Sequence, residues 1–168
     1  ITTGLERFVC HPPAWIAGKR LGLLCNPASV DGHLNHAKDR IYQRFGQQLT
    51  ALFAPQHGFF AEKQDNMIES DDFYDPALSI PIFSLYGKTR RPTREMMNTI
   101  DVLVVDLNDV GTRVYTFLTT LSYCMEAAKQ AGKTVIVLDR PNPVGGCQVE
   151  GNCLAPGFAS FVGRYPIP

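Results

Sequence analysis

An excess of charge of either sign is missing from this 168-residue sequence, in which 16 Lys and Arg balance 16 Asp and Glu. Because the two signs are mixed along the chain, no basic face predicts nucleic-acid binding and no polybasic run predicts membrane binding. A run of about eighteen apolar residues, which a membrane-spanning helix needs, is missing too. The composition predicts one ordinary domain with neither nucleic-acid nor membrane partners.

The motifs of several common site types are also missing. No GxGxxG follows the first apolar run, which leads into Asn26 and Pro27, and neither GxxxxGK[ST] nor GxSxG occurs. These absences exclude dinucleotide, P-loop and triad-hydrolase chemistry in their usual forms, so no cofactor is expected. His33 and His36 lie three residues apart, but no third ligand is near them in the sequence and we predict no metal site.

The five cysteines form an odd set without a CxxC pair. Cys25 and Cys124 lie in apolar segments and are predicted to be core residues, whereas Cys147 and Cys153 share one loop and could meet. Free thiols favour a reducing, cytoplasmic compartment, although a periplasmic or secreted location stays open if a signal peptide preceded Ile1. The chain lacks an initiating Met and ends in the extended segment YPIP, so we expect a fragment of a longer protein.

Short apolar runs alternate with segments of helical periodicity, which is the pattern of an α/β fold. The predicted helices span residues 5–9, 36–45, 92–98 and 114–131, and residues 61–79 are predicted to be a long loop. The predicted strands span residues 21–25, 49–54, 80–85, 102–105 and 134–138. The β-branched run at 102–105 lacks alternation, which predicts a central strand covered on both faces. We therefore expect an open, mostly parallel five-stranded sheet with helices on both faces, Rossmann-like but without a dinucleotide site.

Polar clusters follow four of the five predicted strands. They begin at Asn26, at Gln56 with His57, at Asp106 and at Asp139. Because the carboxyl ends of parallel strands share one edge of the sheet, these residues are expected to converge there.

The strongest chemical candidates among them are carboxylates. Asp106 and Asp139 each follow a buried strand, where partial desolvation can separate the pKa values of two acids into a proton donor and a charged stabiliser. Such pairs act on glycosidic bonds. Each Asp could instead cap a helix or pair with Arg113 or Arg140, and the sequence leaves both interpretations open.

Other residues near these strand ends carry weaker signals. His57 precedes a glycine at a strand exit and is a candidate for a site role, whereas Tyr115 and Phe117 could be sugar-facing platforms or core residues. In the long loop, Glu62 and Glu69 could swing over a bound ligand or stay solvated.

Seven segments carry a resemblance to a known family. They are APQHGF (54–59), SLYG (84–87), RPT (91–93), DLNDVGTRVYTF (106–117), VLDRPNPVGG (137–146), VEG (149–151) and SFVGRYPIP (160–168). In this order they resemble the bacterial exo-acting N-acetylmuramidases, long catalogued as a domain of unknown function. These enzymes remove a terminal N-acetylmuramic acid from the non-reducing end of peptidoglycan fragments.

The resemblance implies a Rossmann-like amino-terminal domain, a smaller carboxy-terminal domain and an active site in the cleft between them. Residues 1–168 would be the first domain, with the second absent from this chain, and we expect the isolated domain to be inactive. The residues that match the family pattern, with their roles left open, are His57, Asn108, Asp109, Arg113, Tyr115, Asp139, Arg140 and Asn142.

One position departs from the family pattern. Many members have Glu where this chain has Gln56, and a neutral amide can neither donate a proton as an acid does nor carry charge. The catalytic acid would then be another carboxylate, with Asp106, Asp109, Glu62 and Glu69 as the options.

Together these observations predict half of a glycosidase cleft for muramic acid sugars in cell-wall turnover. His57 joins the four carboxylates as a catalytic candidate. Substrate contacts are expected from Asn26, Gln56, Asn108, Arg113, Tyr115, Asp139, Arg140 and Asn142. Arg113 or Arg140 would bind the lactyl carboxylate of the sugar as a bidentate fork. The alternative, motivated by Gln56, is a non-catalytic domain that binds or senses muropeptides.

Overall fold

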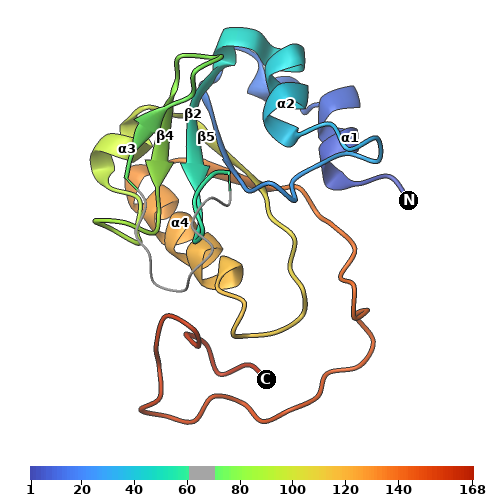
Figure 1. The fold of residues 1–168 in the computed structure, drawn as a ribbon, viewed down its shortest axis with the longest axis vertical. Coiled ribbons are helices and arrows are strands. Elements are labelled where there is room, and N and C mark those ends of the chain that lie inside the picture. Colours follow the sequence, from blue (N-terminus) through green and yellow to red (C-terminus); the bar gives the residue numbers. More distant parts are fainter. Residues whose placement is uncertain (61–70) are drawn as a thin grey trace.

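The computed structural model describes residues 1–60 and 71–168, and their centre is a six-stranded sheet. The strands are β1 (Leu21–Cys25), β2 (Leu49–Ala54), β3 (Phe73–Tyr74), β4 (Pro81–Ser84), β5 (Val102–Asp106) and β6 (Thr134–Val137). Their order is β3-β4-β2-β1-β5-β6, and every neighbouring pair except β3 with β4 is parallel. Figure 1 labels β2, β4 and β5 among them. The predicted parallel α/β sheet is confirmed, and β5 lies between β1 and β6 as a central strand.

The sheet has one strand more than the sequence predicted. β3 pairs antiparallel with β4 at the edge of the sheet, within residues predicted to be a loop. Two residues are too few to show an alternating pattern, so the pairing could not be read from periodicity. Next to β3, the buried Asp75 binds Lys38 Nζ at 2.9 Å and the backbone N–H of Leu78 at 2.8 Å. Burial raises the pKa of Asp75, but these hydrogen bonds outweigh it and leave the pKa below its ordinary value.

Helices cover both faces of the sheet, as predicted. On one face lie α1 (Gly4–Cys10) and α2 (Ala37–Phe45) (Figure 1). A short 3-10 turn follows each of them in the chain, at Ala14–Ile16 after α1 and at Gly46–Gln48 after α2. Leu5 and Ile41 pack on this face against Leu23 and Leu52. Thr3 begins α1 with a capping box to Glu6, which satisfies the first free N–H groups of the helix.

The opposite face is covered by α3 (Arg94–Asn98) and α4 (Phe117–Ala131). Cys124 of α4 is buried there, and Phe53 and Leu103 come from the sheet. Along β5, Val102 and Val104 belong to the first face and Leu103 and Val105 to the second. Both sides of this strand are therefore buried, which explains why its sequence is apolar without alternation.

The helix α4 begins at Phe117, three residues after the predicted start at position 114. The backbone N–H of Tyr115 bonds the carbonyl of Thr112 at 3.1 Å, so residues 112–115 form a turn before the helix. The turn keeps Tyr115 at the rim of the sheet rather than in the core. At its other end, α4 stops at Gly132 in the left-handed conformation, as the sequence predicted.

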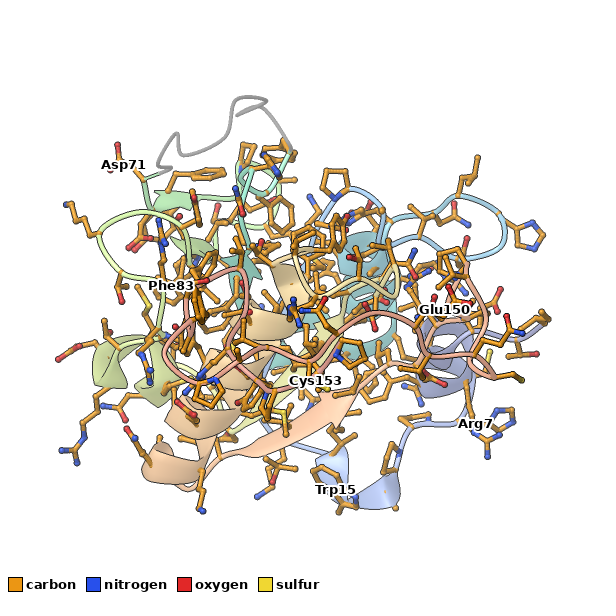
Figure 2. The ribbon with its side chains drawn as sticks, turned by 90° about the horizontal axis from the view of Figure 1, so that it is seen from below. Arg7, Trp15, Asp71, Phe83, Glu150 and Cys153 are labelled. Atoms are coloured by element: carbon orange, nitrogen blue, oxygen red, sulfur yellow. The ribbon has the colours of Figure 1, made fainter. Side chains whose placement is uncertain are left out.

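Residues 138–168 contain no helix or strand and run around the outside of the sheet. They form the long orange-to-red segment of Figure 1, and Figure 2 shows Glu150 and Cys153 on it from below. Arg164 anchors the segment to α4, where its Nη1 donates to Ser122 Oγ at 2.9 Å and its Nη2 binds Glu126. The carbonyl of Ile167 also accepts a hydrogen bond from Arg113, so the last residues of the chain lie beside the loop that follows β5.

None of the helices in the described ranges is long and apolar enough to span a bilayer.

Candidate functional site

The residues that follow β1, β2, β5 and β6 all lie at the carboxyl edge of the parallel sheet. In the order β2-β1-β5-β6, the residues after β2 and those after β6 are three strand spacings apart, about 14 Å. The predicted site residues therefore share one edge but fall into separate groups. These are a pocket beyond β2, an ion pair in the middle and a groove lined by the loops that follow β5 and β6.

The ion pair joins Asp106, at the end of β5, to Arg140. The Asp106 carboxylate is fully buried, with Arg140 Nε 2.5 Å from Oδ1 and Nη2 2.8 Å from Oδ2. Nη2 also donates to the carbonyl of Val30 at 2.9 Å. The hydrogen bonds from Arg140 to Asp106 raise the pKa of Arg140 above its ordinary value. Both carboxylate oxygens are therefore bound, and the pair ties the exits of β5 and β6 to the loop after β1.

The side chain of Asn26 is buried in the turn that follows β1. Its Oδ1 accepts a hydrogen bond from the backbone N–H of Ala28 at 3.1 Å. The Oγ of Ser29 accepts from the backbone N–H of Asn26 at 3.0 Å and donates to the carbonyl of Asp106. Asn26 thus shapes the rim between β1 and β5.

A pocket of about 500 Å³ opens beyond the end of β2. It combines aromatic walls with amides, hydroxyls and one guanidinium, a composition that suits a small polar ligand with apolar faces. No carboxylate belongs to the part of its lining that the structure describes. The lining residues are Gln56, His57, Tyr86, Arg90, Val114, Tyr115, Thr116, Phe117, Ser160, Phe161 and Val162.

Gln56 is held in this pocket by the residue that precedes α4. The hydroxyl of Thr116 donates to Gln56 Oε1 at 2.8 Å. Beside it, the ring of Tyr115 contacts that of Phe117 with centroids 4.6 Å apart. Tyr115 is 37% exposed and Phe117 only 6%, so Tyr115 is the ring of this pair that a ligand can reach.

His57 adopts a backbone conformation that side chains other than glycine rarely take. Its φ is +77°, and Gly58 follows with φ of +80°. A left-handed residue with a Cβ costs roughly 1–2 kcal/mol, and such strain concentrates at functional sites. This backbone directs the loop after β2 so that His57 lines the pocket.

The groove, of about 360 Å³, contains Arg113 and Asn142 in its lining. Arg113 Nη1 donates to the carbonyl of Asn152 at 3.2 Å and to that of Ile167. Asn142 Oδ1 accepts from the backbone N–H of Val144 at 3.0 Å. Both side chains therefore hold loop backbone in place while they line the groove.

Asp109 and Asn108 belong to the loop that leaves β5. The exposed Asp109 accepts a hydrogen bond from the backbone N–H of Gly111 at 3.0 Å, and Asn108 is half-buried. Gly111 has φ of +74° and faces the side chains of Val144 and Asn142 so closely that a Cβ there would clash with both, first with Val144. This close approach holds the loop after β5 against the loop after β6.

Asp139 has an exposed side chain, whereas its backbone anchors the amino end of the fold. Its carbonyl accepts from the N–H of Gly4 at 2.8 Å. Asp139 lies beyond β6, on the far side of the sheet edge from Gln56 and His57. Glu62 and Glu69 lie outside the described residues.

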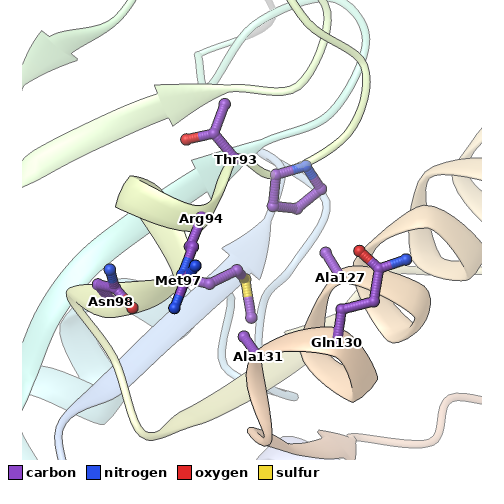
Figure 3. Close-up of a pocket in the computed structure, with 8 residues that line it drawn as sticks. Thr93, Arg94, Met97, Asn98, Ala127, Gln130 and Ala131 are labelled. Carbon is purple, nitrogen blue, oxygen red and sulfur yellow. The ribbon is translucent and has the colours of Figure 1, made fainter.

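A different pocket, of about 400 Å³, lies between α3 and α4 (Figure 3). It is lined by Thr93, Arg94 and Asn98 on one side and by Gln130 on the other. These residues precede β5 and β6 in the chain, so the pocket is near the amino edge of the sheet. It contains none of the predicted site residues.

Neither the histidines nor the cysteines gather into a metal site in the described part of the chain. His36 begins α2 by accepting the N–H of Lys38 at 3.2 Å, and its Nε2 lies 3.0 Å from the carbonyl of Asn26. All five cysteines are free thiols, with Cys25 and Cys124 buried as predicted.

Comparison with known proteins identifies the family. The family described as exo-beta-N-acetylmuramidase NamZ, N-terminal, matches residues 21–168. The chain belongs to this family. It is 45% identical, over all of its 168 residues, to the peptidoglycan beta-N-acetylmuramidase NamZ of Bacillus subtilis (strain 168) and spans 40% of that relative's length.

Two crystal structures of DUF1343 family proteins from Bacteroides fragilis NCTC 9343 share the fold. The first has a TM-score of 0.88 and 41% identity over 99% of this chain and 41% of its own. The second has a TM-score of 0.80 and 30% identity over 99% of this chain and 42% of its own. The NamZ family and the Rossmann-like fold predicted from the sequence are thus both confirmed.

Seven residues of the pocket in this NamZ-family chain were not singled out from the sequence. They are Tyr86, Arg90, Val114, Thr116, Ser160, Phe161 and Val162. Tyr86, Thr116 and Phe161 lie in the segments SLYG, DLNDVGTRVYTF and SFVGRYPIP, and Arg90 directly precedes RPT. These segments were the available signal, but β4 shows no polar cluster directly at its end and residues 160–168 follow no strand.

Proposed function

We propose that this chain forms one half of the active-site cleft of a glycoside hydrolase that releases terminal N-acetylmuramic acid from the non-reducing end of peptidoglycan fragments. Its similarity to a peptidoglycan beta-N-acetylmuramidase over the whole chain supports this function. The part of the full-length protein beyond Pro168 would supply the other half of the cleft.

The observation that carries the proposal is the pocket beyond β2. Tyr115 and Phe161 offer aromatic surface for the apolar face of a sugar ring, while Gln56 and His57 offer polar groups for its hydroxyl and acetamido substituents. Its volume of about 500 Å³ is in the range of small-molecule sites. We assign these four residues to substrate binding.

The proton chemistry needs a carboxylate that the described lining of the pocket does not contain. Asp106 is bound through both oxygens by Arg140, so we assign this pair to holding the rim rather than to proton transfer. The remaining candidates for the catalytic acid are Asp109, Glu62 and Glu69. Of these, Asp109 lies within the described residues, where it is exposed. The full-length protein would place one of them over the pocket, within hydrogen-bond reach of the glycosidic oxygen. Asn108, Arg113, Asp139 and Asn142 would support the same rim.

The alternative is a non-catalytic domain that binds muropeptides. It is favoured by the neutral Gln56 in a pocket whose described lining lacks a carboxylate. Under this alternative the aromatic and amide groups bind the same sugar but no bond is cleaved.

Turnover of a chromogenic β-N-acetylmuramide by the full-length protein separates the two functions. The hydrolase predicts release of the chromophore, and tight binding without release would establish the alternative. A Gln56→Glu variant sharpens the test, because a carboxylate can still accept the hydrogen bond from Thr116. If the neutral side chain of Gln56 limits the rate of hydrolysis, we expect Gln56→Glu to turn over substrate faster than the wild type. Gln56→Ala loses the contact with Thr116 and should show no such increase.

A further inference from the structure

Arg90 is the guanidinium that lines the pocket, and its position is fixed by aromatic rings. Its Cζ lies 4.5 Å from the ring centroid of Tyr86 and 4.5 Å from that of Phe161. The two rings are neighbours, with centroids 5.7 Å apart, so Arg90 lies over both of them. This arrangement orients the guanidinium by cation–π contacts and leaves its N–H groups available to an acceptor.

The nearby arginines differ from Arg90 because each already binds protein oxygens. Arg140 is occupied by Asp106 and Arg113 by two backbone carbonyls. Arg91 and Arg164 share the carboxylate of Glu126. Arg90 makes no ion pair within the described residues.

The pocket wall is also electropositive. Arg90, Arg91 and Arg164 gather around the rings of Tyr123 and Phe161, and Glu126 is the described carboxylate that faces them. Three cations against one carboxylate leave a positive potential beside the pocket, which attracts an anionic ligand group.

We infer that Arg90 binds the carboxylate of an acidic sugar in this pocket and thereby makes the site prefer N-acetylmuramic acid over neutral N-acetylhexosamines. The inference rests on the proposed function and names its specificity residue. A guanidinium held in one plane by aromatic rings can donate two parallel N–H bonds to a carboxylate, a geometry that a neutral hydroxyl cannot match. Under this inference Arg90 has the role that the sequence suggested for Arg113 or Arg140, both of which bind protein oxygens here.

Equilibrium binding to the full-length protein tests the inference without turnover. The ligands are N-acetylmuramic acid, its methyl ester, which keeps the shape but not the charge, and N-acetylglucosamine. We expect the wild type to bind the acid about 10- to 100-fold more tightly than the ester, since charge-assisted hydrogen bonds are worth that much. Arg90→Met should bring this ratio close to one, and Arg90→Lys should keep part of it.

Arg91→Met is the matched control, because Arg91 binds Glu126 and lies over Tyr123 rather than lining the pocket. Because Arg91 contributes to the positive potential but does not line the pocket, its loss should lower the ratio of acid to ester binding far less than the loss of Arg90. A ratio that survives Arg90→Met in a protein with unaltered thermal unfolding overturns the inference, as does a ratio that Arg113→Ala abolishes instead. Equal binding of acid and ester by the wild type overturns the role of Arg90 alone. Binding of none of the three sugars overturns the proposed function together with it.

Discussion

Replacing Arg140 by Met should destabilise the chain strongly, because it leaves the Asp106 carboxylate without its partner. Asp106 is 0% exposed and the Arg140 side chain 10%. Breaking a buried, bidentate ion pair by removing one member costs about 3–5 kcal/mol. For a chain of this length, that free energy corresponds to a fall in melting temperature of roughly 6–20 °C.

Arg20→Met provides the matched control. Arg20 also binds an aspartate with two guanidinium nitrogens, at 3.2 Å and 2.8 Å from the oxygens of Asp101. That pair is solvated, with side chains 47% and 33% exposed, and such pairs contribute at most about 1 kcal/mol. The difference between the two variants therefore measures the effect of burial on two otherwise similar contacts.

Urea unfolding of the wild type, the two single variants and the double variant Asp106→Leu, Arg140→Met is the assay. The double variant should recover part of the loss, since an apolar pair no longer contains an unpaired buried charge. Equal stabilities for Arg140→Met and Arg20→Met would refute the reasoning. If Asp106→Asn instead abolished turnover by the full-length protein well below its unfolding temperature, Asp106 would belong to the proton chemistry.

Three further perturbations follow from the described contacts. Of two variants that both lose the His57 side chain, His57→Gly should be more stable than His57→Ala by about 1 kcal/mol, because only glycine adopts the left-handed backbone without strain, and equal stabilities would contradict the strain argument. Both variants should weaken sugar binding. Asp75→Asn should flatten the fall in stability below about pH 4, because the lowered pKa of Asp75 adds stability that is present above its unfolded pKa and lost as pH falls through the folded one. An unchanged acid limb in denaturant titrations would exclude this linkage. Gly111→Ala should lower the melting temperature more than Gly145→Ala, because both glycines have positive φ but only at Gly111 would the new Cβ clash with Val144 and Asn142.

The sheet could be predicted because its signals are local. The apolar run at 102–105 reflects burial of this strand on both faces, and the turn-forming residues after it mark where the strand ends. Both signals can be read from consecutive residues. The edge strand β3 could not be predicted in this way, since its two residues are held by their pairing to β4 and by Asp75 nearby. The start of α4 was misplaced for a similar reason, because a turn at Tyr115 continues the apolar periodicity without belonging to the helix.

The predicted site was a list of strand ends, and the structure divides that list. His57 and Tyr115 line one pocket, while Arg113 and Asn142 line another groove. Asp106, one of the two carboxylates that the sequence favoured for catalysis, is bound by Arg140. Pairing of Asp106 with an arginine and a catalytic role were equally compatible with the sequence, and the contact with Arg140 depends on a distance that only the fold fixes.

By itself, the sequence determined the order of the helices and of the five parallel strands, because each of these elements has its own pattern in consecutive residues. The edge at which the polar residues gather follows from that order. The tertiary structure alone decided which of those residues share a pocket. That outcome depends on the lateral order of the strands and on contacts between distant segments, such as Arg90 over the ring of Phe161 and Arg164 on α4. No local pattern encodes such contacts, since their free energy depends on side chains that meet only after the chain has folded.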